Sequence, residues 1–483
     1  MNLSFKRLSL TILIALIATS ALAPSLAKAD YTTTVTPTTT FGTWDGWGCS
    51  LCWWANQFGE RDDLADIAFS KKLVDWQGTP IPGLGFNIAR YNVGGCGVGM
   101  TTTAALPAFK KIQGFWLNWN SAVPTSASFD WTLDAKQRLM LAKAKARGVD
   151  QFEMFSDSPM WWMLNNRNPA GGDSGGDNLQ NGNYQRHARY LAIVAKFARD
   201  RWGVNFNYVE PFNEPRAWWW KSNGGQEGCH FDTATQKAVI SYLRQELDSR
   251  GLQATGITAS DENSVDDAIS TWSGFDGATQ NLVSKVNTHG YSGQAAYRGP
   301  NRGVLRAKVG TKKLWQSEYG ESDKSGMTMA DSIIRDINEM HASAWVYWQP
   351  FDSGGWGLIQ SNPGDNWIGP ANPKYFVMAQ FSRHLKKGMT LLNSGDKNTV
   401  AAYDSVSKKL ILISVNYNNA GQWISYDLSR FKSVVGGVLR WMTNTGIGEK
   451  YVSHNDTNLT GKKFSSWFPA NTVQTFEVSN VTL

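Results

Sequence analysis

Segments that read as β-strands recur eight times between residues 43 and 348, each leading into a polar or glycine-rich loop. The predicted strands cover residues 43–50, 85–93, 150–156, 208–212, 254–260, 285–289, 312–318 and 342–348. Amphipathic patterns predict helices at 62–76, 130–147, 184–202, 233–250, 277–283, 329–341 and 372–385. This alternation predicts an α/β fold, a (β/α)8 TIM barrel. A doubly wound open sheet is the alternative, but no glycine-rich dinucleotide loop follows an early strand.

The pattern changes after Met389. Short alternating runs at 399–403, 409–415 and 472–478, separated by Asn, Gly, Ser and Asp, predict a β-sandwich. A Thr-rich segment at 31–40 is expected to pair with this sandwich. The expected organisation is therefore a signal peptide at 1–29, an N-terminal sandwich strand at 30–41, the barrel at 42–387 and the C-terminal β-sandwich at 388–483. Both chain ends together are expected to form this side β-sandwich domain. We expect the sandwich to pack against the barrel, with sugar binding as the alternative.

The N-terminus predicts export. Lys6 and Arg7 precede an apolar run at 8–22, and Ala-Lys-Ala at 27–29 fits a cleavage site. Cleavage after Ala29 removes three basic residues and no acidic ones, leaving 44 basic against 40 acidic side chains. This small charge, without a basic run, argues against nucleic acid, and no later apolar run reaches membrane-spanning length. We expect a secreted, extracellular monomer.

Two residue types add to this picture. The four cysteines, at 49, 52, 96 and 229, are too few for a disulfide scaffold, and no second cysteine pair or His cluster supports a metal at Cys49 and Cys52. A Cys96–Cys229 bridge is the pairing to test. The 23 tryptophans are more informative, because indoles present flat apolar faces that suit stacking on sugars, although many also serve as core.

Glu214 is the candidate proton donor. It ends an apolar strand, and Pro211 and Pro215 prevent a helix on either side. Barrel enzymes carry their chemistry where strands end, and three tryptophans follow at 218–220. Burial among these rings is expected to raise the pKa of Glu214, which suits a general acid. The alternative is a surface-loop glutamate.

Glu318 supplies a second carboxylate at the end of the seventh predicted strand. Two carboxyl groups on either side of a sugar are what glycosidic hydrolysis requires, and a separation of about 5 Å implies direct attack with retained configuration. Glu321 is the competitor, which we place on the following loop. Because acid, base and nucleophile are all side chains, no cofactor or metal is expected.

The motifs around both glutamates resemble a known family. Asn-Glu-Pro at 213–215 and Ser-Glu at 317–318 resemble clan A retaining glycosidases. Trp-Asp-Gly-Trp-Gly at 44–48, Phe-Asn-Ile-Ala-Arg-Tyr-Asn at 86–92 and Trp-Val-Tyr-Trp-Gln at 345–349 are similar to glycoside hydrolase family 30, which combines a barrel with a split sandwich. Loop motifs at 51–56, 226–231 and 355–360 resemble its endo-β-1,6-galactanase branch. The resemblance implies hydrolysis of β-1,6-galactan side chains of arabinogalactan.

The resemblance also implies roles for individual residues. Glu214 is expected to be the acid/base and Glu318 the nucleophile, while Asn213 donates to the sugar 2-hydroxyl. Arg90 and Tyr291 are expected to hold Glu318 ionised and lower its pKa. Further candidates for substrate binding are Trp348 as the floor under the sugar, Asp45, Asn92 and Asp157 for hydroxyls, His289, and Trp54, Trp161, Trp162, Trp219 and Trp356 as walls.

Other readings stay open at this point. A β-1,6-glucanase or xylanase of the same family would use the same two glutamates on another polymer. A non-catalytic sugar-binding barrel would have no turnover, so Glu318→Gln would change neither binding nor activity. A structural cell-wall protein is disfavoured, because the chain has no repeats and no low-complexity stalk.

Overall fold

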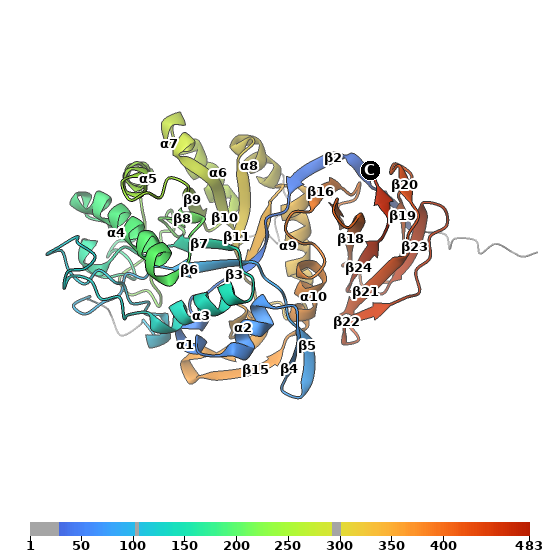
Figure 1. Cartoon of the computed structure of the whole chain (residues 1–483), viewed down its shortest axis with the longest axis horizontal. Helices are drawn as coiled ribbons and strands as arrows, with labels where there is room; N and C mark the ends of the chain where they lie inside the picture. Colours follow the sequence, from blue (N-terminus) through green and yellow to red (C-terminus); the bar gives the residue numbers. More distant parts are fainter. Residues whose placement is uncertain (1–28, 102–105, 292–300) are drawn as a thin grey trace, which may run out of the picture.

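A computed structural model describes residues 29–101, 106–291 and 301–483. Nearly all of the expected signal peptide, residues 1–28, lies outside the described residues. Figure 1 shows two bodies side by side, a barrel surrounded by helices and a β-sandwich.

Eight parallel strands close into a barrel, as predicted. In barrel order they are β3 (Gly46–Ser50), β6 (Ile88–Asn92), β7 (Gln151–Phe155), β8 (Tyr208–Glu210), β9 (Gly256–Glu262), β10 (Val283–His289), β11 (Lys313–Tyr319) and β12 (Ala344–Tyr347). The last strand pairs with the first through Ala344 and Gly46, which closes the ring. Strands such as β6 are buried along their whole length, which is why they read as continuous apolar runs in the sequence.

The helices surround the barrel. They are α1 (Trp54–Phe58), α2 (Asp62–Phe69), α3 (Ala135–Ala146), α4 (Tyr184–Phe197), α5 (Thr233–Asp248), α6 (Val265–Gly274), α7 (Gly277–Leu282), α8 (Asn301–Val309), α9 (Met327–Asn338) and α10 (Pro373–Ser382). Local signals account for several ends. Ser264 caps α6 by accepting from the Asp267 amide, and Pro373 opens α10, where its missing N–H costs nothing. No helix among the described residues is long and apolar enough to cross a membrane.

The helix predicted at 62–76 is partly wrong. It ends at Phe69, and the chain then forms a hairpin of β4 (Leu73–Trp76) and β5 (Thr79–Pro82). Gln77 and Gly78 at its tip have positive φ angles of 54° and 78°, which a helix cannot accommodate. The helices α6 and α8 were not predicted. A further small sheet of β13 (Phe351–Asp352), β14 (Ile359–Asn362) and β15 (Trp367–Ala371) follows the last barrel strand.

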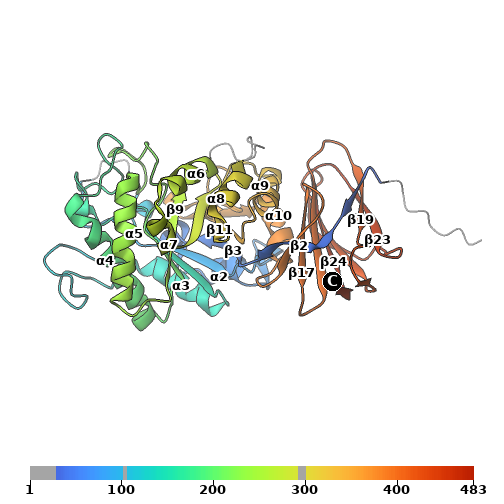
Figure 2. The ribbon, with the colours of Figure 1, turned by 90° about the horizontal axis from the view of Figure 1, so that it is seen from above.

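The sandwich uses both chain ends, as predicted. One sheet has the order β2 (Thr36–Thr43), β16 (Thr390–Asn393), β17 (Thr399–Asp404), β18 (Lys409–Asn416), β24 (Thr472–Val478), β21 (Val438–Asn444) and β22 (Glu449–His454). The other contains β1 (Tyr31–Thr34), β19 (Gln422–Asp427) and β23 (Lys463–Phe468), and β20 (Ser433–Val434) pairs separately with β25 (Val481–Thr482). Figures 1 and 2 both place α9 and α10 on the side of the barrel that faces the sandwich.

Candidate active site

Glu214 follows strand β8 in a constrained turn. Its φ of 46° is left-handed, a conformation that side-chain-bearing residues adopt only when their surroundings hold it. The Glu214 amide donates to the Asp261 carbonyl at 2.8 Å, and the Glu214 carbonyl accepts from Ala217 at 2.9 Å. The carboxylate accepts from Asn263 Nδ2 at 2.8 Å and lies 3.2 Å from His289 Nδ1. These contacts fix the direction in which the acid points.

Glu318, on β11, is held by three groups from two other strands, one from β6 and two from the carboxyl end of β10. Arg90 Nη1 on β6 donates to its Oε2 at 3.1 Å, and Tyr291 Oη after β10 donates to its Oε1 at 3.0 Å. His289 Nδ1 lies 3.4 Å from the same Oε1. The carboxylate is therefore restrained on both oxygens and cannot rotate freely.

Electrostatics at Glu318 differ from the sequence-based expectation. Burial raises the pKa of Glu318, and the His289 and Arg90 cations oppose this without reversing it. The expected lowering of this pKa by Arg90 and Tyr291 is wrong in its net direction, because a carboxyl that is only 4% exposed loses most of its hydration.

His289 is the charged residue beneath both glutamates. Burial alone would lower its pKa, but the Glu318, Asp261 and Glu214 carboxyl groups outweigh this and raise it to about 10. The imidazole is therefore protonated at neutral pH. Asp261, whose pKa the Arg90 and His289 cations hold well below its usual range despite burial, also accepts from Ser317 Oγ at 2.5 Å and from Arg90.

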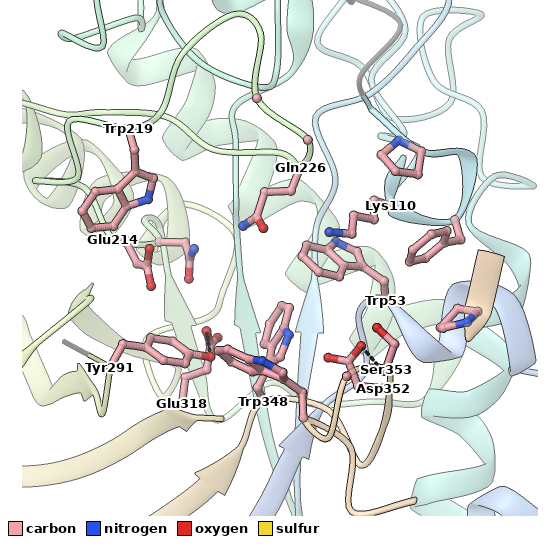
Figure 3. A pocket seen from close by; sticks show the side chains of 18 of the residues that line it. Trp53, Lys110, Glu214, Trp219, Gln226, Tyr291, Glu318, Trp348, Asp352 and Ser353 are labelled. Carbon is pink, nitrogen blue, oxygen red and sulfur yellow. Dashed lines mark hydrogen bonds between the residues drawn. The ribbon is translucent and has the colours of Figure 1, made fainter. Parts of the chain in front are cut away.

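The two glutamates face one cavity. An oxygen of each carboxylate and a ring nitrogen of His289 all lie within 4.8 Å of one another. Both glutamates line a cavity of about 980 Å³ at the carboxyl ends of the barrel strands, shown in Figure 3. An oxygen–oxygen distance of at most 4.8 Å fits the roughly 5 Å between the carboxyl groups of retaining glycosidases better than the roughly 6.5 Å or more of inverting enzymes, which must admit a water.

Several predicted residues do line this cavity. Asn213, Tyr291, Trp348, Trp219 and Trp356 are among its wall residues. The Asn213 side-chain oxygen is buried and has no hydrogen-bond partner among the described residues, so this oxygen is available to accept from a substrate. Arg90 and His289 are fully buried beneath the cavity and act on it through the glutamates.

Asp45 is a correction. It precedes β3 rather than following it, so it lies at the amino ends of the strands, opposite the cavity. There its carboxylate accepts from Lys313 Nζ at 2.6 Å, Trp315 Nε1 at 3.0 Å and Ser343 Oγ at 2.7 Å. The strand predicted at 43–50 included Asp45, but the structure begins β3 one residue later, and the Asp45 side chain joins strand ends instead of binding sugar hydroxyls.

Other predicted wall residues lie behind the cavity or away from it. Asp157 is 1% exposed and accepts from Asn92 Nδ2 at 2.8 Å, so these two polar groups satisfy each other. Trp162 donates to the Trp116 carbonyl at 2.8 Å and packs edge-on against the Trp116 ring. Trp54 and Trp161 are likewise buried outside the lining, and Glu321 pairs with Lys374 Nζ at 2.9 Å.

No binding role was predicted for the residues at the far end of the cavity or for one residue near its centre. The cavity is also lined by Trp53, Phe109, Lys110, Gln226, Asp352 and Ser353, of which only Trp53 and Gln226 fall within the motifs at 51–56 and 226–231. Asn263, which follows β9, donates a hydrogen bond to Glu214. The only sequence signal for it was its position directly after a strand. Lys110 lies in the long link after β6, where no periodic pattern gave a prediction. The proposed Cys96–Cys229 bridge is absent, since all four cysteines are free and buried.

The Glu214, His289 and Glu318 cluster has the spacing of a metal site, and its chemistry fits one poorly. A divalent ion there would sit beside a protonated His289 and within reach of the Arg90 guanidinium, which lies 3.1 Å from Glu318. Like charges at this distance repel in a buried site. A carboxylic acid and a carboxylate acting on one sugar explain the cluster without such repulsion.

The sequence comparisons agree with this geometry. The family model "O-Glycosyl hydrolase family 30" matches residues 26–354. The chain belongs to this family. The chain is therefore an O-glycosyl hydrolase, as the motifs around the two glutamates predicted.

Two relatives are informative. A Hypocrea rufa protein named endo-β-1,6-galactanase is 48% identical over 472 residues, covering 96% of this chain and 98% of its own length. A Bifidobacterium longum subsp. longum protein named exo-β-1,6-galactobiohydrolase is 25% identical over 416 residues, covering 65% of this chain and 27% of its own length.

Solved structures share the fold. A conserved exported protein from Bacteroides fragilis superposes with a TM-score of 0.75 at 21% identity, covering 93% of this chain and all of that one. The catalytic domain of a family 30 xylanase C from Talaromyces cellulolyticus gives 0.70 at 19% identity, with the same coverage. At these identities the likeness concerns the fold alone.

Proposed function

We propose that this family 30 enzyme is a secreted endo-β-1,6-galactanase that cleaves galactan side chains of arabinogalactan by double displacement. The separation of at most 4.8 Å between oxygens of Glu214 and Glu318 carries the mechanism. The 48% identity to the Hypocrea rufa endo-β-1,6-galactanase, over nearly the whole of both chains, supports the substrate.

In the first step Glu318 attacks the anomeric carbon of the sugar bound over Trp348, and Glu214 protonates the leaving oxygen. The C–O glycosidic bond breaks as a Glu318–sugar ester forms, and the shortened chain leaves. In the second step Glu214 removes a proton from water, which attacks the anomeric carbon and releases Glu318. Tyr291 and Arg90 hold the nucleophile in line throughout. All groups that act are side chains, so the reaction proceeds without a cofactor.

A substrate panel tests the proposal. Purified protein is incubated with β-1,6-galactan, β-1,6-glucan and glucuronoxylan, with Glu318→Gln as the inactive control. We expect new reducing ends and a mixture of oligosaccharides from galactan alone. Cleavage of glucan or xylan but not galactan would refute the substrate and leave the two-glutamate mechanism standing.

The proposal includes export, supported by the leader pattern at the N-terminus, and a monomeric state. Expression of the full chain with its leader in a secreting host, followed by N-terminal sequencing of the protein in the medium, checks it. We expect mature protein that begins at Asp30 and elutes as a monomer. Retention of the uncleaved chain in the cell would contradict the export claim.

A further inference from the structure

The cavity continues beyond the catalytic pair on one side of Trp348. At that end its wall includes Trp53 after β3, Lys110 in the loop after β6, and Asp352 and Ser353 after β12. Figure 3 shows Glu214 and Trp219 toward one end of the pocket and these four side chains toward the other, with Trp348 between. The pocket is therefore longer than one sugar needs, and its two ends are chemically different.

The direction of the substrate follows from the acid. Glu214 protonates the oxygen of the leaving group, so the leaving part of the chain lies on the Glu214 and Trp219 side. The sugar that is attacked lies over Trp348, and the rest of the donor chain must extend the other way. That path leads to Trp53, Lys110 and Asp352.

These residues form a prepared polar site. The Lys110 ammonium lies 4.1 Å from the centre of the Trp53 ring, and no described residue accepts a hydrogen bond from it. Burial lowers the pKa of Lys110 and raises that of Asp352, which shows that both charged groups have given up water. An ammonium held on an indole face without an acceptor is suited to donate to a ligand oxygen.

The site is also held in place. Gln349 Oε1 accepts from the amides of Trp53 and Trp54 at 3.0 and 3.1 Å, which fixes the loop after β3. The Trp53 ring packs edge-on against Trp348 with centroids 5.0 Å apart, and the Ser353 amide donates to Asp352 Oδ1 at 2.7 Å. Asn56 Nδ2 binds the Phe109 carbonyl at 2.8 Å, so the neighbour of Lys110 is anchored too.

We propose that Trp53, Lys110 and Asp352 form a second donor-side subsite that binds the next galactosyl unit, with Lys110 donating to and Asp352 accepting from its hydroxyl groups. One cation and one anion in the same subsite favour a neutral sugar, which both donates and accepts hydrogen bonds. The assignment rests on the proposed galactanase function and specifies why the enzyme needs a chain rather than a single sugar.

Two nitrophenyl substrates test this subsite. Nitrophenyl β-galactoside fills only the position over Trp348, whereas nitrophenyl β-1,6-galactobioside also reaches the second unit. We expect the wild-type enzyme to prefer the bioside in kcat/KM by tenfold or more. In Lys110→Met and in Asp352→Asn this preference should fall about tenfold, as for the loss of one hydrogen bond to a charged group. Lys72→Met, an exposed lysine away from the cavity, should leave the preference as in wild type.

The outcomes distinguish failure of the subsite from failure of the proposed galactanase function. Wild-type enzyme that cleaves the monoside and the bioside equally well, or variants that lose both activities in proportion, would overturn the subsite. Wild-type enzyme that cleaves neither galactoside nor galactan would overturn the proposed function instead. Thermal unfolding of each variant shows whether a proportional loss reflects misfolding.

Discussion

At the residue scale, Glu214 and Glu318 have different catalytic roles, so replacing each one should impair a different part of the reaction. Glu214→Ala removes the proton donor, which a dinitrophenyl leaving group does not need, so the first step should persist on dinitrophenyl β-galactobioside. Glu318→Ala removes the attacking oxygen and should lower kcat on the same substrate by about 10⁴-fold or more.

Azide identifies the step that each variant has lost. Added to Glu214→Ala it should restore turnover and give the β-galactosyl azide, because azide needs no base to attack the enzyme-bound sugar. Equal losses in both variants on the activated substrate, with no azide product, would contradict the two roles.

His289 is a positioning residue whose charge should be visible in the pH profile. Its cation lies 3.4 Å from Glu318 and opposes the rise in pKa that burial causes. Glu318 must be ionised to attack, so activity falls as the pH drops through its pKa. Replacing His289 with Gln raises that pKa further, and the acid limb of kcat/KM should move to higher pH by about one unit.

The control for this shift is His454→Gln, which alters a histidine on β22 of the sandwich, remote from the cavity. We expect its acid limb to coincide with that of the wild type. An unmoved limb in His289→Gln, or a shift to lower pH, would show that His289 does not carry its charge next to Glu318.

At the scale of elements, Asp45 links strand ends instead of binding substrate. Its carboxylate accepts from Lys313 and Trp315 on β11 and from Ser343 before β12. Asp45→Ala leaves the buried Trp315 and Ser343 donors without an acceptor and should lower the free energy of unfolding by about 2–3 kcal/mol. Its kcat/KM per folded molecule should match the wild type. Loss of activity at unchanged stability would show that Asp45 acts in the active site.

The barrel strands were predictable because they are buried on both faces and end in recognisable loops. The prediction at 208–212 overlaps β8, and that at 312–318 overlaps β11, so Glu214 and Glu318 fell at the correct ends. Asp45 failed because it lies at the amino end of the strand predicted at 43–50, whereas a barrel site forms at the carboxyl ends of the strands. The hairpin at 73–82 failed because Gln77 and Gly78 adopt left-handed angles that composition alone did not indicate.

The far part of the site could not be predicted for a different reason. Trp53 immediately before α1, Lys110 at the end of a short 3-10 helix and Asp352 on β13 are distant in sequence and meet only because the barrel closes. No periodic pattern fixes the direction of a loop. The pKa of Glu318 was also missed, because motifs identify its charged partners without revealing how completely the carboxyl is buried.

At the scale of the whole molecule, one face of the larger sandwich sheet packs into the hydrophobic core of the barrel, while a second buried cluster lies within the sandwich itself. Ile411, Ile413 and Val473 of the sandwich belong to the same buried cluster as the barrel residues. Polar contacts cross the boundary as well: Gln380 Nε2 on α10 donates to Thr443 Oγ1 at 2.9 Å, and Thr475 Oγ1 donates to the Gln380 carbonyl at 3.1 Å. The two bodies therefore depend on each other.

This dependence predicts a single cooperative transition in thermal unfolding. Ile413→Ala in the shared core should lower the free energy of unfolding by about 2–5 kcal/mol and lower the midpoint of barrel and sandwich together. Calorimetry combined with loss of activity checks it. Two separated transitions, with activity surviving the first, would show that the sandwich folds independently.

The central claim is that Glu318 attacks the sugar directly while Glu214 serves as acid and then base. The most direct measurement is the anomer of the first product released from β-1,6-galacto-oligosaccharide, read by proton NMR before mutarotation. Two displacements at one carbon predict the β-anomer first. Initial appearance of the α-anomer would contradict the account, because it requires a water between the two carboxyl groups.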